Sequence, residues 1–215
     1  MSVTAINKKV KGDQVRITES QLRRIIRETL LTEARWTPRV LADKGMKIFV
    51  QRKPGTVRIH CNPREDVSSM EFGTLYVDTE ADPEGGGICD KAWEVVFADV
   101  FLGKGMGPLL YDIAMELSGK HGLMPDRREV SSEAWPVWNY YLSRRPDIEH
   151  RQLDNPQNVR TPTRKDNCWQ ESAEDDELSD GWESSPLSKA YRVKGGGTPT
   201  INELERLGLI TFKDE

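Results

Sequence analysis

Residues 92–118 constrain the fold of this chain more than any other part of its sequence. The apolar run Trp93–Val100 is typical of a buried strand, and apolar residues at helical spacing over 107–118 predict a helix. Between them, residues 102–107 spell LGKGMG, whose three glycines favour a tight turn with several N–H groups aimed the same way. Pro108 suits the first turn of a helix. This strand–loop–helix unit predicts a phosphate site, or else a glycine-rich turn without a ligand.

Short strand patterns precede this unit and a second helix follows it. Residues 47–52 and 56–61 flank a hairpin-like turn, and residues 72–78 predict another strand. Leu123 and Met124 begin a further strand, and a helix is expected from Ser131 or Ser132 through Arg144. Together these elements predict an α+β domain with a mixed, mostly antiparallel sheet flanked by helices.

The two ends of the chain differ in character from its middle. Residues 1–35 form a tail with an amphipathic helix over 17–31, whose first turn carries a capping box. Residues 36–155 form the predicted domain. Residues 156–215 are expected to be a polar extension, with Trp182, Leu187 and Tyr191 as a surface-packing clasp. A capping box at 200–203 predicts a short helix over 204–207, and 209–212 an edge strand.

Charge and cysteine content narrow the classes of protein to which this chain can belong. The net charge of −4 does not favour nucleic acid, although residues 1–40 carry nine basic and four acidic residues. The run 171–183 holds seven acidic residues and no basic one, which is typical of a solvated loop. The three cysteines show no C-x-x-C spacing, so neither a disulfide framework nor a metal site is expected. With no membrane-length apolar run, a soluble protein of a reducing cytoplasm is expected.

Two motifs resemble the GNAT family of acyl-CoA-dependent N-acyltransferases over roughly residues 45–155. The LGKGMG loop fits the family pattern (Q/R)-x-x-G-x-(G/A) except at Leu102, where the family has Gln or Arg. The segment VSSEAWPVWNYYLSRR is similar to the second family motif, with Ala134 in place and Trp138 where a tyrosine usually stands. It also resembles a branch of the family encoded by tailed phages.

The resemblance implies a site for acetyl-CoA and a transfer of its acyl group to an amine. The coenzyme diphosphate is expected on the loop, and its pantetheine arm beside the strand that precedes the loop. Glu94 is the expected base, and Tyr140 or Tyr141 the expected acid; the alternatives are a solvent-facing carboxylate and core tyrosines. The expected coenzyme contacts are Val95, Val96, Phe97, Leu102, Gly103, Lys104, Gly105, Met106, Gly107 and Trp138.

The N-terminal helix leaves three interpretations open. It docks on its own domain, it binds a groove of a partner, or it is a capsid-targeting segment, since Leu31-Thr32-Glu33 is similar to the site cut by phage prohead proteases. On the last interpretation residues 17–33 contact a capsid or prohead protease, and the protein occupies the host cytoplasm or the virion. The rival to an enzyme is a GNAT-like virion or interaction module that has lost its chemistry. Direct nucleic-acid binding through residues 8–27 rests on charge alone.

Overall fold

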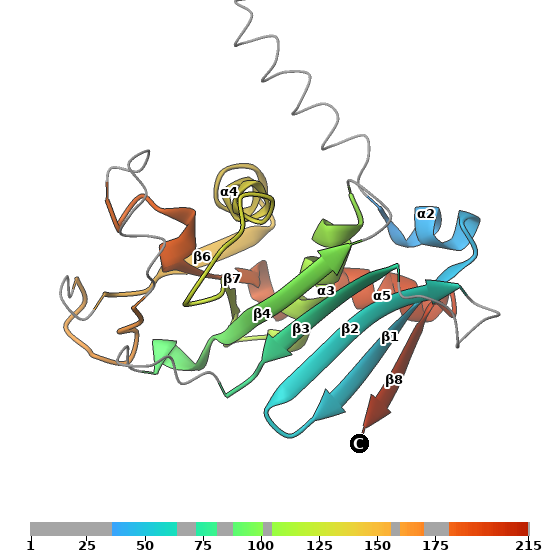
Figure 1. Cartoon of the computed structure of the whole chain (residues 1–215), viewed down its shortest axis with the longest axis horizontal. Helices are drawn as coiled ribbons and strands as arrows, with labels where there is room; N and C mark the ends of the chain where they lie inside the picture. The colour runs from blue at the N-terminus through green and yellow to red at the C-terminus, as the bar shows by residue number, and fades with distance from the viewer. Residues whose placement is uncertain are drawn as a thin grey trace, which may run out of the picture. The chain divides into compact units, whose positions relative to one another are not determined.

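The computed structural model describes residues 36–63, 72–80, 88–100, 105–155, 160–169 and 181–214 (Figure 1). The predicted helix over 17–31, the cleavage motif at 31–33 and residues 171–180 of the acidic run lie outside them. The helices are α2 (Pro38–Asp43), α3 (Met106–Ser118), α4 (Trp135–Arg144) and α5 (Pro199–Arg206). The strands are β1 (Met46–Lys53), β2 (Thr56–Pro63), β3 (Gly73–Asp78), β4 (Trp93–Val100), β5 (Leu123–Met124), β6 (Ile148–Gln152), β7 (Lys189–Val193) and β8 (Ile210–Asp214). No helix in this part of the chain is long and apolar enough to cross a bilayer.

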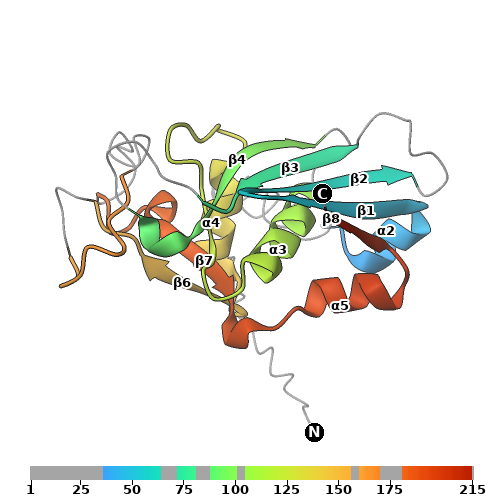
Figure 2. The same cartoon turned by 90° about the horizontal axis from the view of Figure 1, so that it is seen from below.

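The eight strands of the described ranges form one mixed sheet in the order β6-β7-β5-β4-β3-β2-β1-β8. The pairs β1–β2, β2–β3, β3–β4, β5–β7 and β6–β7 are antiparallel, whereas β4–β5 and β1–β8 are parallel. Helices α2, α3 and α5 lie on one face of the sheet (Figure 2). The predicted α+β class with a mostly antiparallel sheet is therefore confirmed.

The core lies between this face of the sheet and α3. Successive side chains of β1 and β2 point to opposite faces of the sheet, and one of these faces is covered by helices. The side chains on the covered face form part of the core: Ile48, Val50, Val57 and Ile59. Helix α3 contacts β2, β3, β4, β5 and β7 and is buried along nearly its whole length. This burial fixes the position of the N-terminal end of α3 relative to β4.

The segment 156–215, expected to be a polar extension with an edge strand over 209–212, supplies that edge strand as β8 and one strand that was not expected, β7. Strand β7 inserts between β5 and β6, and β8 pairs in parallel with β1. Trp182, Leu187 and Tyr191 are almost fully buried core residues, which corrects the prediction of a surface clasp. The Trp182 indole donates to the Leu153 carbonyl at 2.6 Å, so this polar-looking stretch packs through a few large side chains.

A disulfide joins Cys89 to Cys168, contrary to the sequence-based expectation of no disulfide framework. The two cysteines are 79 positions apart, and only the fold brings them together. Cys89 lies in the short turn Cys89–Lys91 before β4, whose three residues all have positive φ. The Cys89 N–H donates to the Asn167 carbonyl at 3.1 Å, so backbone hydrogen bonding holds the same two segments together. Cys61 is free and buried in β2.

Gly122, which precedes β5, can be tested as a position that admits only glycine. Its φ is +78°, and a Cβ added there would stand 2.9 Å from the Tyr191 carbonyl oxygen on β7. We expect Gly122→Ala to lower the free energy of unfolding by about 2–4 kcal/mol, through left-handed strain plus displacement of β7. Urea unfolding measures this loss. Gly119→Ala is the matched control, because Gly119 also has positive φ but has open space around it; equal losses would contradict the close approach.

Candidate functional site

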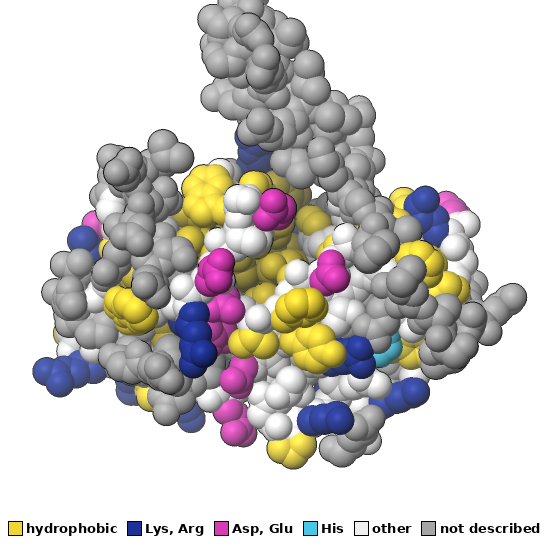
Figure 3. Space-filling model, in the orientation of Figure 1, with side chains coloured by type: hydrophobic (Ala, Val, Ile, Leu, Met, Phe, Trp, Pro, Cys, Tyr) yellow, Lys and Arg dark blue, Asp and Glu magenta, His cyan; other side chains and the backbone are white. Residues whose placement is uncertain are grey.

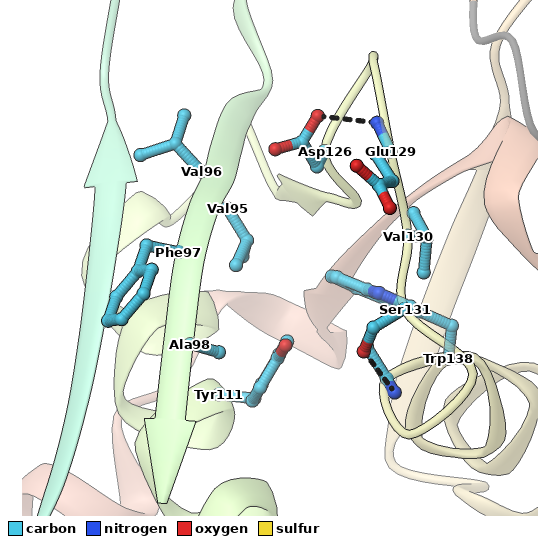
Figure 4. A pocket seen from close by; sticks show the side chains of 11 residues that line it. Val95, Val96, Phe97, Ala98, Tyr111, Asp126, Glu129, Val130, Ser131 and Trp138 are labelled. Atoms are coloured by element: carbon cyan, nitrogen blue, oxygen red, sulfur yellow. Dashed lines mark hydrogen bonds between the residues drawn. The ribbon is translucent and has the colours of Figure 1, made fainter.

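A gap opens between the parallel strands β4 and β5. Strand β5 pairs with β4 only at Trp93 and Glu94, the first two residues of β4, and the chain then turns away through residues 125–134. Beyond this fork the β4 edge borders a cavity of about 150 Å³ (Figure 4). The cavity is lined by Val95, Val96, Phe97, Ala98, Tyr111, Asp126, Glu129, Val130, Ser131, Ala134 and Trp138. Three segments far apart in the sequence therefore enclose one space.

The β4 wall of this cavity carries a β-bulge. In the pairing with β3, Tyr76 faces Phe97 and Val77 faces Val95, so Val96 is the extra residue. A bulge bends a strand locally and redirects its backbone groups, and bulges are common next to active sites. Val96 and Phe97 are also 44% and 51% exposed, which is unusual for large apolar side chains in the middle of a strand. Figure 4 shows the Val96 and Phe97 side chains on the side of β4 away from Trp138, and Val95 and Ala98 on the side that faces the cavity.

Two aromatic side chains form the inner end of the cavity. Tyr111 of α3 and Trp138 of α4 pack edge to face, with ring centroids 5.2 Å apart, and are only 4% and 1% exposed. Figure 4 shows the Tyr111 hydroxyl directed into the space between β4 and Trp138. Burial raises the pKa of Tyr111, so the hydroxyl stays protonated and can donate.

Carboxylates stand at the β5 end of the cavity. The turn that follows β5 is held by Asp126, whose Oδ1 accepts from the N–H groups of Arg128 and Glu129 at 2.7 and 3.1 Å. Figure 4 shows the carboxylates of Asp126 and Glu129 level with Val95 and Val96 along β4, whereas Tyr111 lies level with Ala98. The acidic end and the hydroxyl end of the cavity are therefore distinct.

Glu94 lies at the fork, where the two strands separate. Its side chain is 8% exposed, and its Oε1 accepts from the Arg127 N–H at 2.6 Å. The pKa of Glu94 is raised, chiefly by burial and further by the carboxylates of Asp126 and Asp78; the hydrogen bond from Arg127 opposes this shift. A buried carboxylate with a raised pKa has the character of a general base.

The glycine turn lies at the opposite end of β4, where α3 begins. Gly105 caps α3 with a φ of 119°, a conformation that side-chain-bearing residues rarely adopt. The first N–H groups of α3, including those of Met106 and Gly107, have no partner within the helix and carry the positive end of its dipole. Leu102, Gly103 and Lys104 lie outside the described residues. The described part of the turn therefore presents the positive end of a helix, which favours an anion.

The structure gathers some of the sequence-predicted site residues and separates others. Val95, Val96, Phe97 and Trp138 all line the cavity. Tyr141 does not line it: its hydroxyl lies 2.9 Å from Asp112 Oδ1 and 3.0 Å from the Pro108 carbonyl oxygen, within the helix packing. Tyr140 packs edge to face on Tyr141 and is likewise not a lining residue.

Sequence reasoning named four of the eleven lining residues as site residues, and it missed the three with ionisable side chains. In the sequence, Tyr111 is one residue of a predicted amphipathic helix. Its apolar neighbours do not indicate that its hydroxyl faces a cavity. Asp126 and Glu129 read as part of a polar turn. The only signal in the sequence was the position of Asp126 and Glu129 directly after β5. Residues that follow a strand paired with β4 lie beside the edge of β4.

These groups together suit proton transfer and the binding of an extended, partly apolar molecule with an anionic end. Redirected main-chain groups, a protonated hydroxyl and carboxylates face one cavity, and Ala98 at one end of it lies two residues before the end of β4. Among the described residues, no cluster of three or more side chains could hold a metal ion. Comparisons with protein-family models, with curated proteins and with solved structures find no match for this chain.

Proposed function

We propose that this protein is an N-acyltransferase that moves an acyl group from a coenzyme A thioester to an amine. The observation that carries the proposal is the gap between β4 and β5, which leaves β4 from Val95 to Ala98 beside a cavity instead of beside β5. The family resemblance implies a gap at this place, because the pantetheine arm runs along the strand before the glycine loop. The motif resemblance and the gap support the same assignment independently.

In this proposal the donor lies along β4. Its diphosphate binds the N–H groups at the start of α3, where the helix dipole favours an anion. Its pantetheine arm extends beside the edge of β4 that β5 leaves unpaired, and the bulged backbone at Val96 donates to the thioester carbonyl. Val95 and Ala98, whose side chains Figure 4 shows on the cavity side of β4, would cover the apolar part of the arm.

The transfer needs one base for the attacking amine and one acid for the leaving thiolate. The neutral amine nitrogen attacks the thioester carbon, a C–N bond forms and the C–S bond breaks. Glu94 takes the proton that the amine loses, directly or through one water at the fork. Tyr111 gives a proton to the leaving thiolate, a role that its protonated and inward-directed hydroxyl suits better than the engaged hydroxyl of Tyr141. The acid expected at Tyr140 or Tyr141 is therefore reassigned to Tyr111.

Titration calorimetry with coenzyme A tests the proposal directly. We expect binding with a Kd between about 1 µM and 1 mM. Ala98→Trp, which fills the gap from the β4 wall, should weaken this binding at least about tenfold, because the apolar arm loses its place. Lys213→Trp, at an exposed position of β8, is the matched control and should bind normally. Absence of binding at millimolar coenzyme would contradict the proposal.

The second candidate function is a coenzyme-binding module without catalysis. Two departures from the family motifs favour it: Leu102 replaces Gln or Arg, and Trp138 stands where a tyrosine is usual. The buried Tyr111 hydroxyl argues for retained chemistry. Coenzyme binding combined with no acyl transfer to a broad panel of amines would favour the module.

A further inference from the structure

We propose that the face of the sheet opposite α3, which we call the open face, binds single-stranded nucleic acid by stacking its bases and neutralising its phosphates. The open face consists of the side chains of β1, β2, β3, β4 and β8 that point away from the helices. Figure 2 shows none of the described helices on that side of these strands. The inference goes beyond the proposed transferase and does not depend on it. It is carried by a row of aromatic and basic side chains that crosses the five strands.

Strand pairing sets this row. Side chains of directly paired residues lie on the same face of a sheet and close together. From β4 to β8, the register aligns Phe97, Tyr76, Arg58, Gln51 and Lys213. The strand neighbours of this row are buried on the helix side, so the row itself points outward: Val50, Val57, Ile59, Leu75 and Val77. Five strands about 4.8 Å apart make the row about 19 Å long, which is enough for several nucleotides.

The β4 end of the row offers two aromatic rings. Phe97 and Tyr76 meet edge to face with their ring centroids 5.8 Å apart, and the exposed Val96 extends this apolar surface. About half of Phe97 is exposed to solvent. The acyl donor proposed above lies on the other side of β4, so it leaves these side chains uncovered. An exposed ring can stack on a nucleobase of any sequence, because every base has a flat π-face.

The other end of the row is basic. The Arg58 guanidinium lies over the Tyr76 ring, 5.3 Å from its centroid. Lys213 of β8 and Lys47 of β1 hold their ammonium groups 6.0 and 5.9 Å from the centroid of the Phe49 ring. A guanidinium stacked on a ring still presents N–H donors at its edge, and lysine ammonium groups are point charges for phosphates. The cations and the rings therefore alternate over a short distance, as stacking platforms for single strands require.

The charge of the open face complements a phosphate chain, although the whole protein is acidic. Four of its side chains are basic: Lys47, Lys53, Arg58 and Lys213. The two acidic ones, Asp78 and Asp99, lie on β3 and β4, beside the rings. Figure 3 views this face and shows Lys, Arg and His side chains next to hydrophobic ones over β1–β3, with most of the visible Asp and Glu side chains toward β4. Phosphates therefore belong on β1, β2 and β8, and bases on the rings of β3 and β4.

Fluorescence anisotropy with a labelled octathymidylate tests the site. Stacking and phosphate contacts do not involve the sugar 2′-hydroxyl, so this probe represents single strands of DNA and RNA alike. We expect binding that weakens as the salt concentration rises, because the basic side chains release counterions from the phosphates. A blunt duplex of eight base pairs should bind at least about tenfold more weakly, since its paired bases cannot stack on the rings.

Two variants separate stacking from charge. Phe97→Leu keeps an apolar side chain and removes the ring, so it should weaken binding by about 5- to 50-fold and leave the salt dependence unchanged. Arg58→Gln should weaken binding and lower the slope of log affinity against log salt by about 0.7. Phe212→Leu and Arg52→Gln are the matched controls, because this ring and this cation contact each other on the helix side of β8 and β1. Both controls should bind like wild type, and thermal unfolding shows that each variant is folded.

Three results would overturn the nucleic-acid site. The first is equal affinity for the duplex and the single strand, and the second is equal affinity for an octaglutamate peptide, since either would mean that the surface binds any polyanion. The third is wild-type affinity in Phe97→Leu or in Arg58→Gln, because the site requires both stacking and phosphate contacts. Coenzyme A binding without octathymidylate binding removes this site and leaves the transferase standing, whereas the opposite result keeps this site and removes the transferase.

Discussion

Arg127→Ala is expected to lower the free energy of unfolding by about 3–5 kcal/mol. Arg127 is 1% exposed, and its guanidinium donates to the Leu187 carbonyl and lies 3.4 Å from Cys168 Sγ. Truncation leaves a large void under the turn that bears Asp126 and Glu129, and it strips the Leu187 carbonyl of its donor. Burial lowers the pKa of Arg127 to about 10, so the charge itself is costly to bury, although it persists at neutral pH. Urea unfolding measures the loss.

Two further variants separate the volume of Arg127 from its charge. Arg127→Met keeps most of the volume and removes the buried charge, so we expect a loss of only about 1–2 kcal/mol. Arg128→Ala, at the exposed neighbouring position, should stay within about 0.5 kcal/mol of wild type. If Arg127→Ala and Arg128→Ala unfolded at the same urea concentration, Arg127 would not be the anchor of this turn.

The parts of the fold that sequence predicts well are those set by neighbouring residues. The alternating residues of β1 and β2 and the turn between them predict a hairpin, and the structure pairs Met46–Lys53 with Thr56–Pro63. The predicted strand over Trp93–Val100 has the bounds of β4. The predicted helix over 107–118 begins one residue earlier, at Met106. Each signal is local, because hydrophobic period and turn chemistry act over a few residues.

Contacts between distant residues explain what sequence reasoning missed. The sequence predicts that a Thr200–Glu203 capping box starts the last helix, but α5 begins at Pro199, and Glu116 of α3 accepts the N–H groups of Thr200 and Ile201 at 2.8 Å each. Strand β7 carries only a few apolar residues and becomes a strand by inserting between β5 and β6. The cavity likewise exists because β5 is only two residues long, which no periodicity reveals.

Wild-type kcat for acyl transfer to the acceptor amine is expected to rise with pH and then to stay level. Glu94 acts as a base only when it is deprotonated. Because burial raises the pKa of Glu94, activity should fall at a higher pH than the pKa of an ordinary glutamate would predict. Tyr111 acts as an acid only when it is protonated, and burial raises its pKa too, so its ionisation adds no alkaline loss below about pH 10. Glu94→Gln should lower kcat by about 10²- to 10⁴-fold and abolish the rise.

Tyr111→Phe is the matched variant, because it removes an acid and leaves the base in place. We expect it to lower kcat by about 10²-fold while the pH of the rise and the affinity for coenzyme A stay as in wild type. Rates of acetyl transfer are measured from pH 5 to 10, and kcat and KM are determined separately at each pH. The pH dependence of kcat then distinguishes the two variants. If kcat of Glu94→Gln still rose with pH, the rise would come from another ionising group, such as the acceptor amine itself. Since Glu94 also accepts from the Arg127 N–H, unfolding curves of this variant show whether a lost turn, rather than a lost base, lowers its rate.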